Sequence, residues 1–253
     1  MTTIQKLQSL KLAGMAKCIE TRNDYALEKQ LSYMDFIELL IEDELANRQS
    51  NSYRKRFVQS KLSEEKSIQT YDFSYQPKLD KKLLLDLASC RFIHDKQNII
   101  FMGNPGVGKT HLANALGLEI LRQGMKAQFL HATELIDLLL VARGNGSYSS
   151  IMKKLLELDC LIIDELGFKS MPKSSVDEFF EIIRRRYEHK SIIITSNRNF
   201  EEWPDIFGDA VLAGAIVDRI VHHSVVIRIT GNSYRTKHLI SNKNSLNKGG
   251  VSS

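Results

Sequence analysis

The 253-residue chain has few cysteines and no long apolar run, and both absences limit what it can be. Its three cysteines are Cys18, Cys90 and Cys160, which are widely spaced and form no Cys-x-x-Cys pair. This spacing predicts reduced thiols and indicates neither a disulfide framework nor a zinc site. No run of about 18 apolar residues occurs, and residues 1–6 lack the apolar centre of a secretory signal. We therefore expect a cytoplasmic protein without a membrane partner.

Charge is unevenly distributed along the chain, although the formal net charge is only +5. Residues 48–61 and residues 228–253 each contain five basic residues and no acid. The basic residues are Arg48, Arg54, Lys55, Arg56 and Lys61 in the first zone and Arg228, Arg235, Lys237, Lys243 and Lys248 in the second. Such zones can neutralise the phosphates of DNA. A solvated helix face and a flexible tail explain the same pattern, so charge alone leaves DNA contact open.

The N-terminal part of the chain has the pattern of helices. Ser32 and Asp35 have the spacing of a capping box, and apolar residues on both sides recur at helical intervals. Residues 1–68 are therefore predicted to form a small all-helical domain that binds DNA or a partner. Residues 71–77 combine aromatic residues with the first proline, which predicts a connector. We expect its aromatic side chains to pin the connector to the domain surface rather than to stack on a base.

Beyond residue 78, apolar strands alternate with helical stretches, which predicts an α/β fold with a parallel sheet flanked by helices. The expected strands are 98–102, 127–131, 159–163, 191–195 and 224–229. This second domain is predicted to cover residues 69–240. Residues 241–253 are rich in glycine, asparagine and serine, and we expect this tail to be disordered.

Residues 103–110 form a complete phosphate-binding loop between the expected strand 98–102 and a helix that begins at Thr110. Its glycines allow successive backbone N–H groups to turn toward phosphates, Lys109 reaches the outer phosphates, and the Thr110 hydroxyl can ligate Mg²⁺. His111 follows directly and is included in the expected nucleotide-binding set. The loop consists of Gly103, Asn104, Pro105, Gly106, Val107, Gly108, Lys109 and Thr110.

Two further strands end in polar residues. The apolar run 161–163 is followed by Asp164, expected to hold Mg²⁺, and by Glu165, expected to orient the attacking water. Asn197 follows the apolar strand 192–194 and is expected to hydrogen-bond the same water. The alternative is that Asn197 only caps the next turn.

Two arginines lie near the last expected strand. Arg219 precedes it and Arg235 follows it. An arginine from a neighbouring subunit can stabilise the charge that develops in phosphoryl transfer. Pairing of Arg219 with Asp218 is the plainer alternative. The consecutive arginines 184–186 point in different directions on a helix, and we expect them to be solvated or to face DNA.

The choice of nucleotide follows from a missing motif. Residues 164–167 also fit the Asp-x-x-Gly pattern of GTPases, but the guanine-reading Asn-Lys-x-Asp is absent, so ATP is the expected nucleotide. A small-molecule kinase is disfavoured by Glu165, Asn197 and Arg219 and by the lack of an obvious lid. His111, His131, His222 and His223 have no metal-ligand spacing, so we expect them to be structural or surface residues.

Taken together, these motifs resemble the IstB-type transposition helper ATPases, a branch of the AAA+ superfamily related to DnaC helicase loaders and to DnaA. The resemblance runs from about residue 4 to about residue 240. It rests on the segments 103–113, 161–167, 194–197 and 231–235, on Trp203 with 207–209, on 218–223 and, more weakly, on 10–16.

The resemblance implies a function and a set of roles. Arg219 would be an arginine finger acting in trans, Asn197 the first sensor and Arg235 the second, although few helical residues follow Arg235 to form a lid. It also implies an ATP-dependent, Mg²⁺-dependent ATPase that forms a head-to-tail ring or filament on double-stranded DNA and recruits or stimulates a transposase. The alternative within the same resemblance is a DnaC-like replicative helicase loader.

Overall fold

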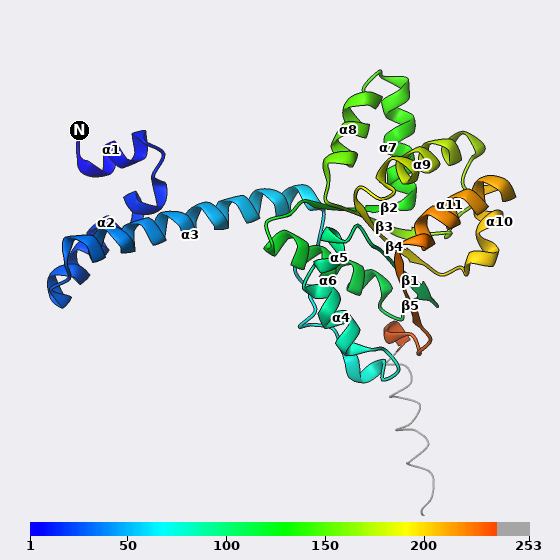
Figure 1. Cartoon of the computed structure of the whole chain (residues 1–253), viewed down its shortest axis with the longest axis horizontal. Helices are drawn as coiled ribbons and strands as arrows, with labels where there is room; N and C mark the ends of the chain where they lie inside the picture. The colour runs from blue at the N-terminus through cyan, green and yellow to red at the C-terminus, as the bar shows by residue number, and fades with distance from the viewer. Residues whose placement is uncertain (237–253) are drawn as a thin grey trace, which may run out of the picture. The chain divides into compact units, whose positions relative to one another are not determined.

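The computed structural model describes residues 1–236 and separates the chain into two compact units, 1–58 and 59–253. The predicted disordered tail 241–253 and the three lysines of the second basic zone lie outside the described residues. Figure 1 labels the helices and strands of both units. No helix of the described chain is both long enough and apolar enough to cross a membrane.

The first unit is built from helices α1 (Thr3–Ser9), α2 (Ala13–Lys29) and most of α3 (Tyr33–Ser60). The predicted capping box is confirmed, because the Asp35 N–H donates to the Ser32 hydroxyl while the Ser32 N–H donates to the Asp35 carboxylate. Near Lys11 the chain turns between α1 and α2, with φ of 59°. The apolar residues that recur at helical intervals before Ser32 therefore belong to two helices.

Glu44 of α3 joins α2 to α3. Its buried carboxylate accepts the N–H groups of Gly14 at 2.6 Å and Met15 at 3.3 Å, at the start of α2, and it also accepts from Arg48 at 2.6 Å. Leu12, at the N-cap of α2, provides no side-chain cap. Glu44 therefore accepts hydrogen bonds from N–H groups that have no acceptor within the helix. Gly14 permits this contact, because a Cβ there would lie 2.7 Å from the Asp43 carbonyl oxygen.

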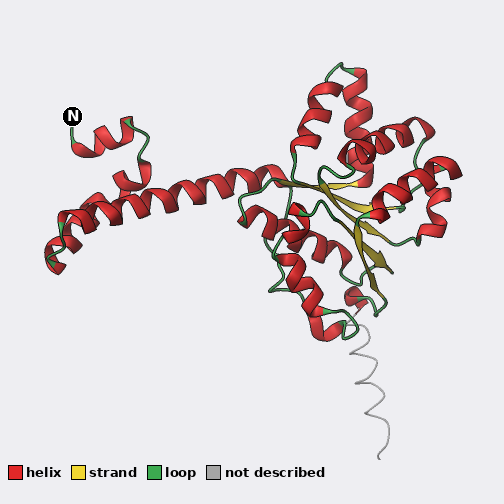
Figure 2. Cartoon of the chain, in the orientation of Figure 1, coloured by secondary structure: helices red, strands yellow, loops and turns green. Residues whose placement is uncertain are grey.

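In the second unit, strands and helices alternate, as the sequence predicts (Figure 2). The strands are β1 (Asn98–Gly103), β2 (Ala127–His131), β3 (Cys160–Leu166), β4 (Ser191–Ser196) and β5 (Ser224–Ile229). The α-helices are α4 (Lys81–Ala88), α5 (Arg91–His94), α6 (Lys109–Arg122), α7 (Ala132–Gly144), α8 (Tyr148–Glu157), α9 (Lys173–Arg186), α10 (Trp203–Phe207) and α11 (Ala210–His222). Short 3₁₀ turns occupy Phe73–Tyr75, Phe200–Glu202 and Tyr234–Thr236.

Within the described residues the strands form one parallel five-stranded sheet in the order β2-β3-β4-β1-β5. Ile100, Ile163 and Ile194 point to one face, where they pack with apolar residues of α7 to α11. Helix α6 covers the opposite face and contacts β1, β2, β3 and β4. Both faces are buried, which explains why the strands are continuous apolar runs rather than alternating ones. The predicted fold class is confirmed.

The chain joins the second unit earlier than the connector signal indicated. Leu62 is buried, the Ser63 N–H donates to the Asn114 side chain at 2.9 Å, and Asn114 returns hydrogen bonds to the carbonyl oxygens of Ser63 and Lys66. Residues 59–68, placed in the N-terminal domain by sequence, are therefore grouped with the sheet. Aromatic residues and proline indicate where the backbone changes direction. The attachment of residues 59–68 to the second unit depends instead on Asn114, a residue of α6 that lies 51 positions beyond Ser63 in the chain.

The arginines 184–186, all expected to be solvated or to face DNA, differ from one another in burial. Arg184 and Arg185 are exposed and pair with Glu181, at 2.8 and 3.5 Å. Arg186 is fully buried, and its guanidinium donates to the carbonyl oxygens of Leu155, Leu158 and Ser191. Burial lowers the pKa of Arg186 to about 10, which keeps the group charged at neutral pH. The expectation of a solvated or DNA-facing side chain is wrong for Arg186.

Replacing Arg186 should be far more damaging than replacing its neighbour. Arg186→Met removes the donors to three carbonyl oxygens, and we expect the free energy of unfolding to fall by about 3 kcal/mol. The matched control is Arg185→Met on the same helix, where loss of an exposed ion pair should cost less than about 1 kcal/mol. Urea unfolding of both variants compares the two. Equal losses would contradict the structural role of Arg186.

Candidate functional site

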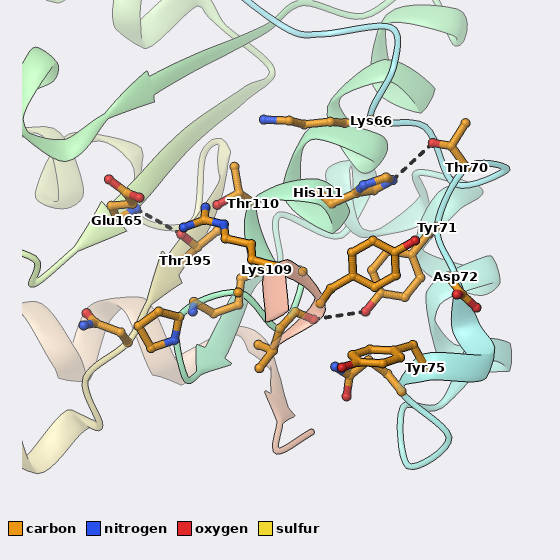
Figure 3. A pocket seen from close by; sticks show the side chains of 18 of the residues that line it. Lys66, Thr70, Tyr71, Asp72, Tyr75, Lys109, Thr110, His111, Glu165 and Thr195 are labelled. Atoms are coloured by element: carbon orange, nitrogen blue, oxygen red, sulfur yellow. Dashed lines mark hydrogen bonds between the residues drawn. The ribbon is translucent and has the colours of Figure 1, made fainter. Parts of the chain in front are cut away.

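A cavity of about 370 Å³ lies where β1, β3 and β4 end at the same edge of the sheet. Figure 3 shows Lys109, Thr110, Glu165 and Thr195 on one side of it and Thr70, Tyr71 and Tyr75 on the other. The lining residues are Lys66, Thr70, Tyr71, Asp72, Tyr75, Gln76, Pro105, Gly106, Val107, Gly108, Lys109, Thr110, His111, Glu165, Phe168, Thr195, Asn197, Tyr234 and Arg235. Segments far apart in the sequence therefore share one cavity.

The phosphate-binding loop leads from β1 into α6, as predicted. Gly108 has φ of 100°, a conformation that favours glycine, and a Cβ there would lie 2.7 Å from the ring of Tyr71. Lys109 Nζ donates to the carbonyl oxygens of Gly103 at 2.7 Å and Asn104 at 2.9 Å, so its ammonium group is held over the loop. The N-terminus of α6 faces the same space, which makes the loop suitable for an anion.

The charge environment of Lys109 is mixed. Burial lowers its pKa below the ordinary value, the carboxylates of Asp164 and Glu165 oppose that shift, and Arg235 adds to it. Arg235 is exposed and lines the cavity. Lys109 and Arg235 therefore place two positive charges at the same cavity, and a bound polyphosphate would relieve the repulsion between them.

Asp164 lies at the centre of a hydrogen-bond network. Its carboxylate is fully buried and accepts the Thr110 hydroxyl at 2.9 and 3.1 Å and the Thr195 hydroxyl at 2.5 Å. The Thr195 hydroxyl in turn accepts the Glu165 N–H at 3.0 Å. These contacts connect the loop, β3 and β4, and they hold the Asp164 carboxylate and the Glu165 backbone in place.

Thr110 and Asp164 also have the chemistry of a magnesium site. A hydroxyl oxygen and a carboxylate oxygen 2.9 Å apart form the all-oxygen donor set that Mg²⁺ prefers, and both lie beside the phosphate loop. The residues present therefore fit the predicted metal. The remaining ligands of such an ion would be water and phosphate oxygens.

Glu165 adopts an unusual backbone conformation. Its φ is 60°, and the pairing of β3 with β4 shifts between Ile163 and Leu166. Strand β3 thus continues through the two acids, whereas the sequence predicted that it would end before them. This bulge buries Asp164 and leaves Glu165 half exposed at the cavity. Left-handed backbone at a residue with a Cβ is costly and is concentrated at functional sites.

His131, at the end of β2, faces both acids. Its Nδ1 lies 3.5 Å from Asp164 Oδ2 and 3.7 Å from Glu165 Oε2. The parallel register explains this position, because His131 is paired with Asp164 across β2 and β3. His131 was expected to be structural or on the surface, and sequence spacing contained no signal for its proximity to the acids.

Residues 66–76 form the wall opposite the acids. The Tyr71 hydroxyl donates to the Val107 carbonyl at 3.3 Å, and a His111 ring nitrogen lies 2.7 Å from the Ser67 carbonyl oxygen. Burial raises the pKa of Tyr71 to about 12 and lowers that of His111 below its ordinary value. The aromatic connector therefore packs on the loop, as expected, and also lines the cavity. His111 lines it too, while its ring anchors the connector.

The chain after β5 closes the remaining side. The Tyr234 N–H donates to the Gly106 carbonyl at 2.8 Å, and the Tyr75 hydroxyl donates to the Ser233 carbonyl at 3.1 Å. Tyr75 and Tyr234 meet edge to face, with ring centroids 5.3 Å apart. These contacts bring Arg235, which the family resemblance implies as a second sensor, to the cavity.

The structure brings all but one of the predicted catalytic residues to the cavity. Glu165 and Asn197 line it. Arg219 of α11 is not among the lining residues; its guanidinium donates to the Ala215 carbonyl at 3.0 Å and lies 5.2 Å from the centre of the Phe180 ring. Sequence reasoning missed Thr195 as well as His131, and the signal for Thr195 was a hydroxyl directly after the apolar run 192–194.

Comparisons with known proteins cover most of the chain. The family model of the IstB-like ATP binding protein matches residues 5–242. The chain is 39% identical to the ATP-binding protein of insertion sequence IS5376 from Geobacillus stearothermophilus, over 90% of this chain and 91% of that protein. It is 37% identical to the ATP-binding protein of insertion sequence IS21 from Pseudomonas aeruginosa, over 91% and 87% of the two chains.

Solved structures share the fold. DnaA from Aquifex aeolicus, bound to AMPPCP, matches with a TM-score of 0.57 at 21% identity, over 74% of this chain and 57% of that chain. The present chain thus spans little more than half of the DnaA structure. A DnaC helicase loader matches with a TM-score of 0.50 at 25% identity, over 58% of this chain and 88% of the loader.

Proposed function

The chain belongs to the IstB-like ATP-binding protein family, and from this membership we propose that it is an ATP-hydrolysing, DNA-binding helper of transposition. In this proposal it assembles head to tail on double-stranded DNA in the cytoplasm and recruits or stimulates a transposase. ATP binding and hydrolysis control assembly and release. The observation that carries the ATPase part is the network joining Thr110, Asp164 and Thr195 beside Glu165.

In this proposal, each group of residues at the cavity has its own role in ATP hydrolysis. The loop N–H groups and Lys109 bind the phosphates, and Arg235 adds a second cation at the cavity. Thr110 and Asp164 would hold Mg²⁺, which neutralises phosphate charge when bound. Glu165 orients the attacking water and Asn197 donates to the same water. The tyrosine-bearing wall of residues 66–76 is assigned to the nucleoside, because it lines the cavity opposite Glu165 and Thr195 (Figure 3).

Arg219 supports completion of the site by a neighbour. It lies on α11, outside the residues that line its own cavity, and it is held by Ala215 and Phe180 rather than by an acid. An arginine that reaches a site from the next subunit requires a heterologous contact, which produces rings or filaments. This geometry is the basis for proposing a homo-oligomer.

The DNA part of the proposal rests on the first basic zone. Arg48 and Lys61 pair with acids of the chain, at 2.6 and 3.6 Å. Arg54 and Lys55 of α3 are exposed. We propose that these two contact DNA phosphates, and that the contact is largely independent of base sequence because phosphate contacts carry no direct sequence information.

Sedimentation of the full-length protein with ATP, Mg²⁺ and duplex DNA tests the proposal. We expect ATP-dependent assembly on DNA, with an affinity that falls steeply as salt rises. Arg54→Ala/Lys55→Ala should weaken binding to all sequences and reduce the salt slope by about 2, because about one counterion is released per phosphate contact. Lys153→Ala/Lys154→Ala, which removes two exposed lysines of α8, is the matched control. A protein that stays monomeric with ATP and DNA together would overturn the proposal.

The similarity to a DnaC loader supports a second candidate, a replicative helicase loader. The insertion-sequence relatives match more of this chain at higher identity, so transposition is the preferred process. Capture of purified transposase or replicative helicase by the ATP-bound, DNA-bound assembly separates the two, and retention of the helicase alone would favour the loader.

A further inference from the structure

Two histidines and a glutamate form a cluster away from the nucleotide cavity. Glu188 lies in the turn between α9 and β4, and His222 and His223 lie where α11 leads into β5. One possible ligand atom from each lies within 4.8 Å of the others, and all three side chains are exposed. Sequence spacing predicts structural or surface roles for both histidines, because the glutamate is brought to them only by the fold.

The backbone on both sides of the cluster is anchored to buried structure. The N–H groups of His189 and Lys190 donate to the carbonyl oxygen of Arg186, at 3.0 and 2.9 Å, and the Arg186 guanidinium is itself buried. On the other side, the Asn98 N–H donates to the His223 carbonyl at 2.7 Å. The segments that carry Glu188 and His223 are therefore rigidly held, which is the condition for a preformed site.

The side chains are also oriented toward one another. His223 Nε2 lies 3.6 Å from Glu188 Oε1, and His222 Nδ1 lies 3.0 Å from the Tyr187 hydroxyl. The rings of His222 and His223 meet edge to face, with centroids 4.2 Å apart. A hydrogen-bond partner that fixes an imidazole ring is a recurring feature of metal-binding histidines, and Tyr187 has that position here.

We propose that Glu188, His222 and His223 form a zinc site, with water in the fourth position. Two imidazoles and one carboxylate are a donor set that zinc accepts, with an open coordination position. Zinc bonds of about 2.0 to 2.2 Å in a tetrahedron separate neighbouring ligand atoms by about 3.4 Å. The pair at 3.6 Å is already close to that separation. Small rotations of exposed side chains would bring the third ligand into place.

A bound ion would connect two elements that also hold Arg219. His222 lies one helical turn beyond Arg219 on α11, and Glu188 follows α9, whose Phe180 ring supports the Arg219 guanidinium. Zinc would therefore fasten the end of α11 to the α9–β4 turn. The site is chemically distinct from the oxygen-only pair Thr110 and Asp164, so Mg²⁺ should not occupy it.

Calorimetric titration of the full-length protein with ZnCl₂ tests the site, in the absence of nucleotide and with Mg²⁺ in excess. We expect one zinc per chain in the wild type. His222→Ala and His223→Ala should each weaken binding on the order of 100-fold, and Tyr187→Phe about 10-fold, because loss of an outer partner costs about that much. His189→Ala, which removes an exposed histidine from the same turn, is the matched control and should bind zinc like the wild type.

Two further readouts make the result decisive. Zinc should raise the melting temperature of the wild type and of His189→Ala but not of His223→Ala. Glu188→Gln changes one exposed side chain in a turn, so its loss of zinc affinity cannot be attributed to misfolding. Unchanged zinc affinity in Glu188→Gln and His222→Ala would overturn the proposal, as would an equal loss in His189→Ala.

Discussion

Glu165→Gln is expected to abolish ATP turnover while ATP binding is retained. The substituted side chain would keep the size of the original and the left-handed backbone but could no longer polarise water, so we expect turnover to fall by about 10²- to 10⁴-fold. Lys109 Nζ is held by the carbonyl oxygens of Gly103 and Asn104 rather than by Glu165, so the nucleotide affinity should change little. Turnover is measured by phosphate release and affinity by equilibrium binding of labelled ATP. The variant should accumulate in its ATP-bound assembly.

Lys109→Ala and Glu157→Gln provide the comparison for Glu165→Gln. Lys109→Ala removes the ammonium group held over the loop and should lose ATP binding itself. Glu157 is an exposed acid at the end of α8 that faces Lys153 at 4.0 Å, and Glu157→Gln should behave like the wild type. If Glu165→Gln lost ATP binding to the same extent as Lys109→Ala, the assignment of Glu165 to water positioning would be wrong.

Subunit mixing should restore ATP turnover that Arg219→Ala alone has lost. Arg219 does not line its own cavity, so the variant should bind ATP normally while its turnover falls by about 10³-fold or more. In an equal mixture with Lys109→Ala protein, some Arg219→Ala sites would receive an intact arginine from the next subunit. Random head-to-tail assembly would complete roughly a quarter of all sites. Phosphate release is measured as the ratio of the two proteins is varied.

The mixing experiment has a direct control. A Lys109→Ala/Arg219→Ala double variant cannot supply the arginine, so its mixture with Arg219→Ala should stay inactive. Arg219→Lys keeps a cation near the Phe180 ring but lacks the planar fork of donors, so we expect it to recover only part of the turnover. If no ratio of Arg219→Ala to Lys109→Ala protein restored turnover, a trans role for Arg219 would be excluded.

Prediction from sequence succeeded where a structural feature is determined by residues that are close together in the sequence. The five strands appear as contiguous apolar runs because both faces of a parallel sheet are buried, and the structure confirms all of them to within a few residues. The extension of β3 through Asp164 and Glu165 was missed, because a carboxylate pair normally ends an apolar strand. Here Asp164 remains inside because Thr110 and Thr195 satisfy its oxygens.

Prediction failed where the environment of a side chain is determined by a partner that is far away in the sequence. Arg184, Arg185 and Arg186 are identical in the sequence, but only Arg186 faces three carbonyl oxygens between α8 and β4. His131 has no local signal, and the register of β2 with β3 brings it to the acids. Propensity and periodicity describe which face of an element is apolar, and they contain no information about which polar group the fold places opposite.

The sequence by itself determined that this protein has a phosphate-binding loop, because consecutive backbone N–H groups and the adjoining Lys109 and Thr110 form it without help from distant residues. It also determined the apolar strand that leads to Asp164 and Glu165. Only the tertiary structure decided what surrounds them: the Thr195 hydroxyl, the wall of residues 66–76 and the cluster at Glu188. The physical reason is that the first features follow from short-range geometry, whereas the others require strand register and helix packing to bring distant side chains within a few ångströms.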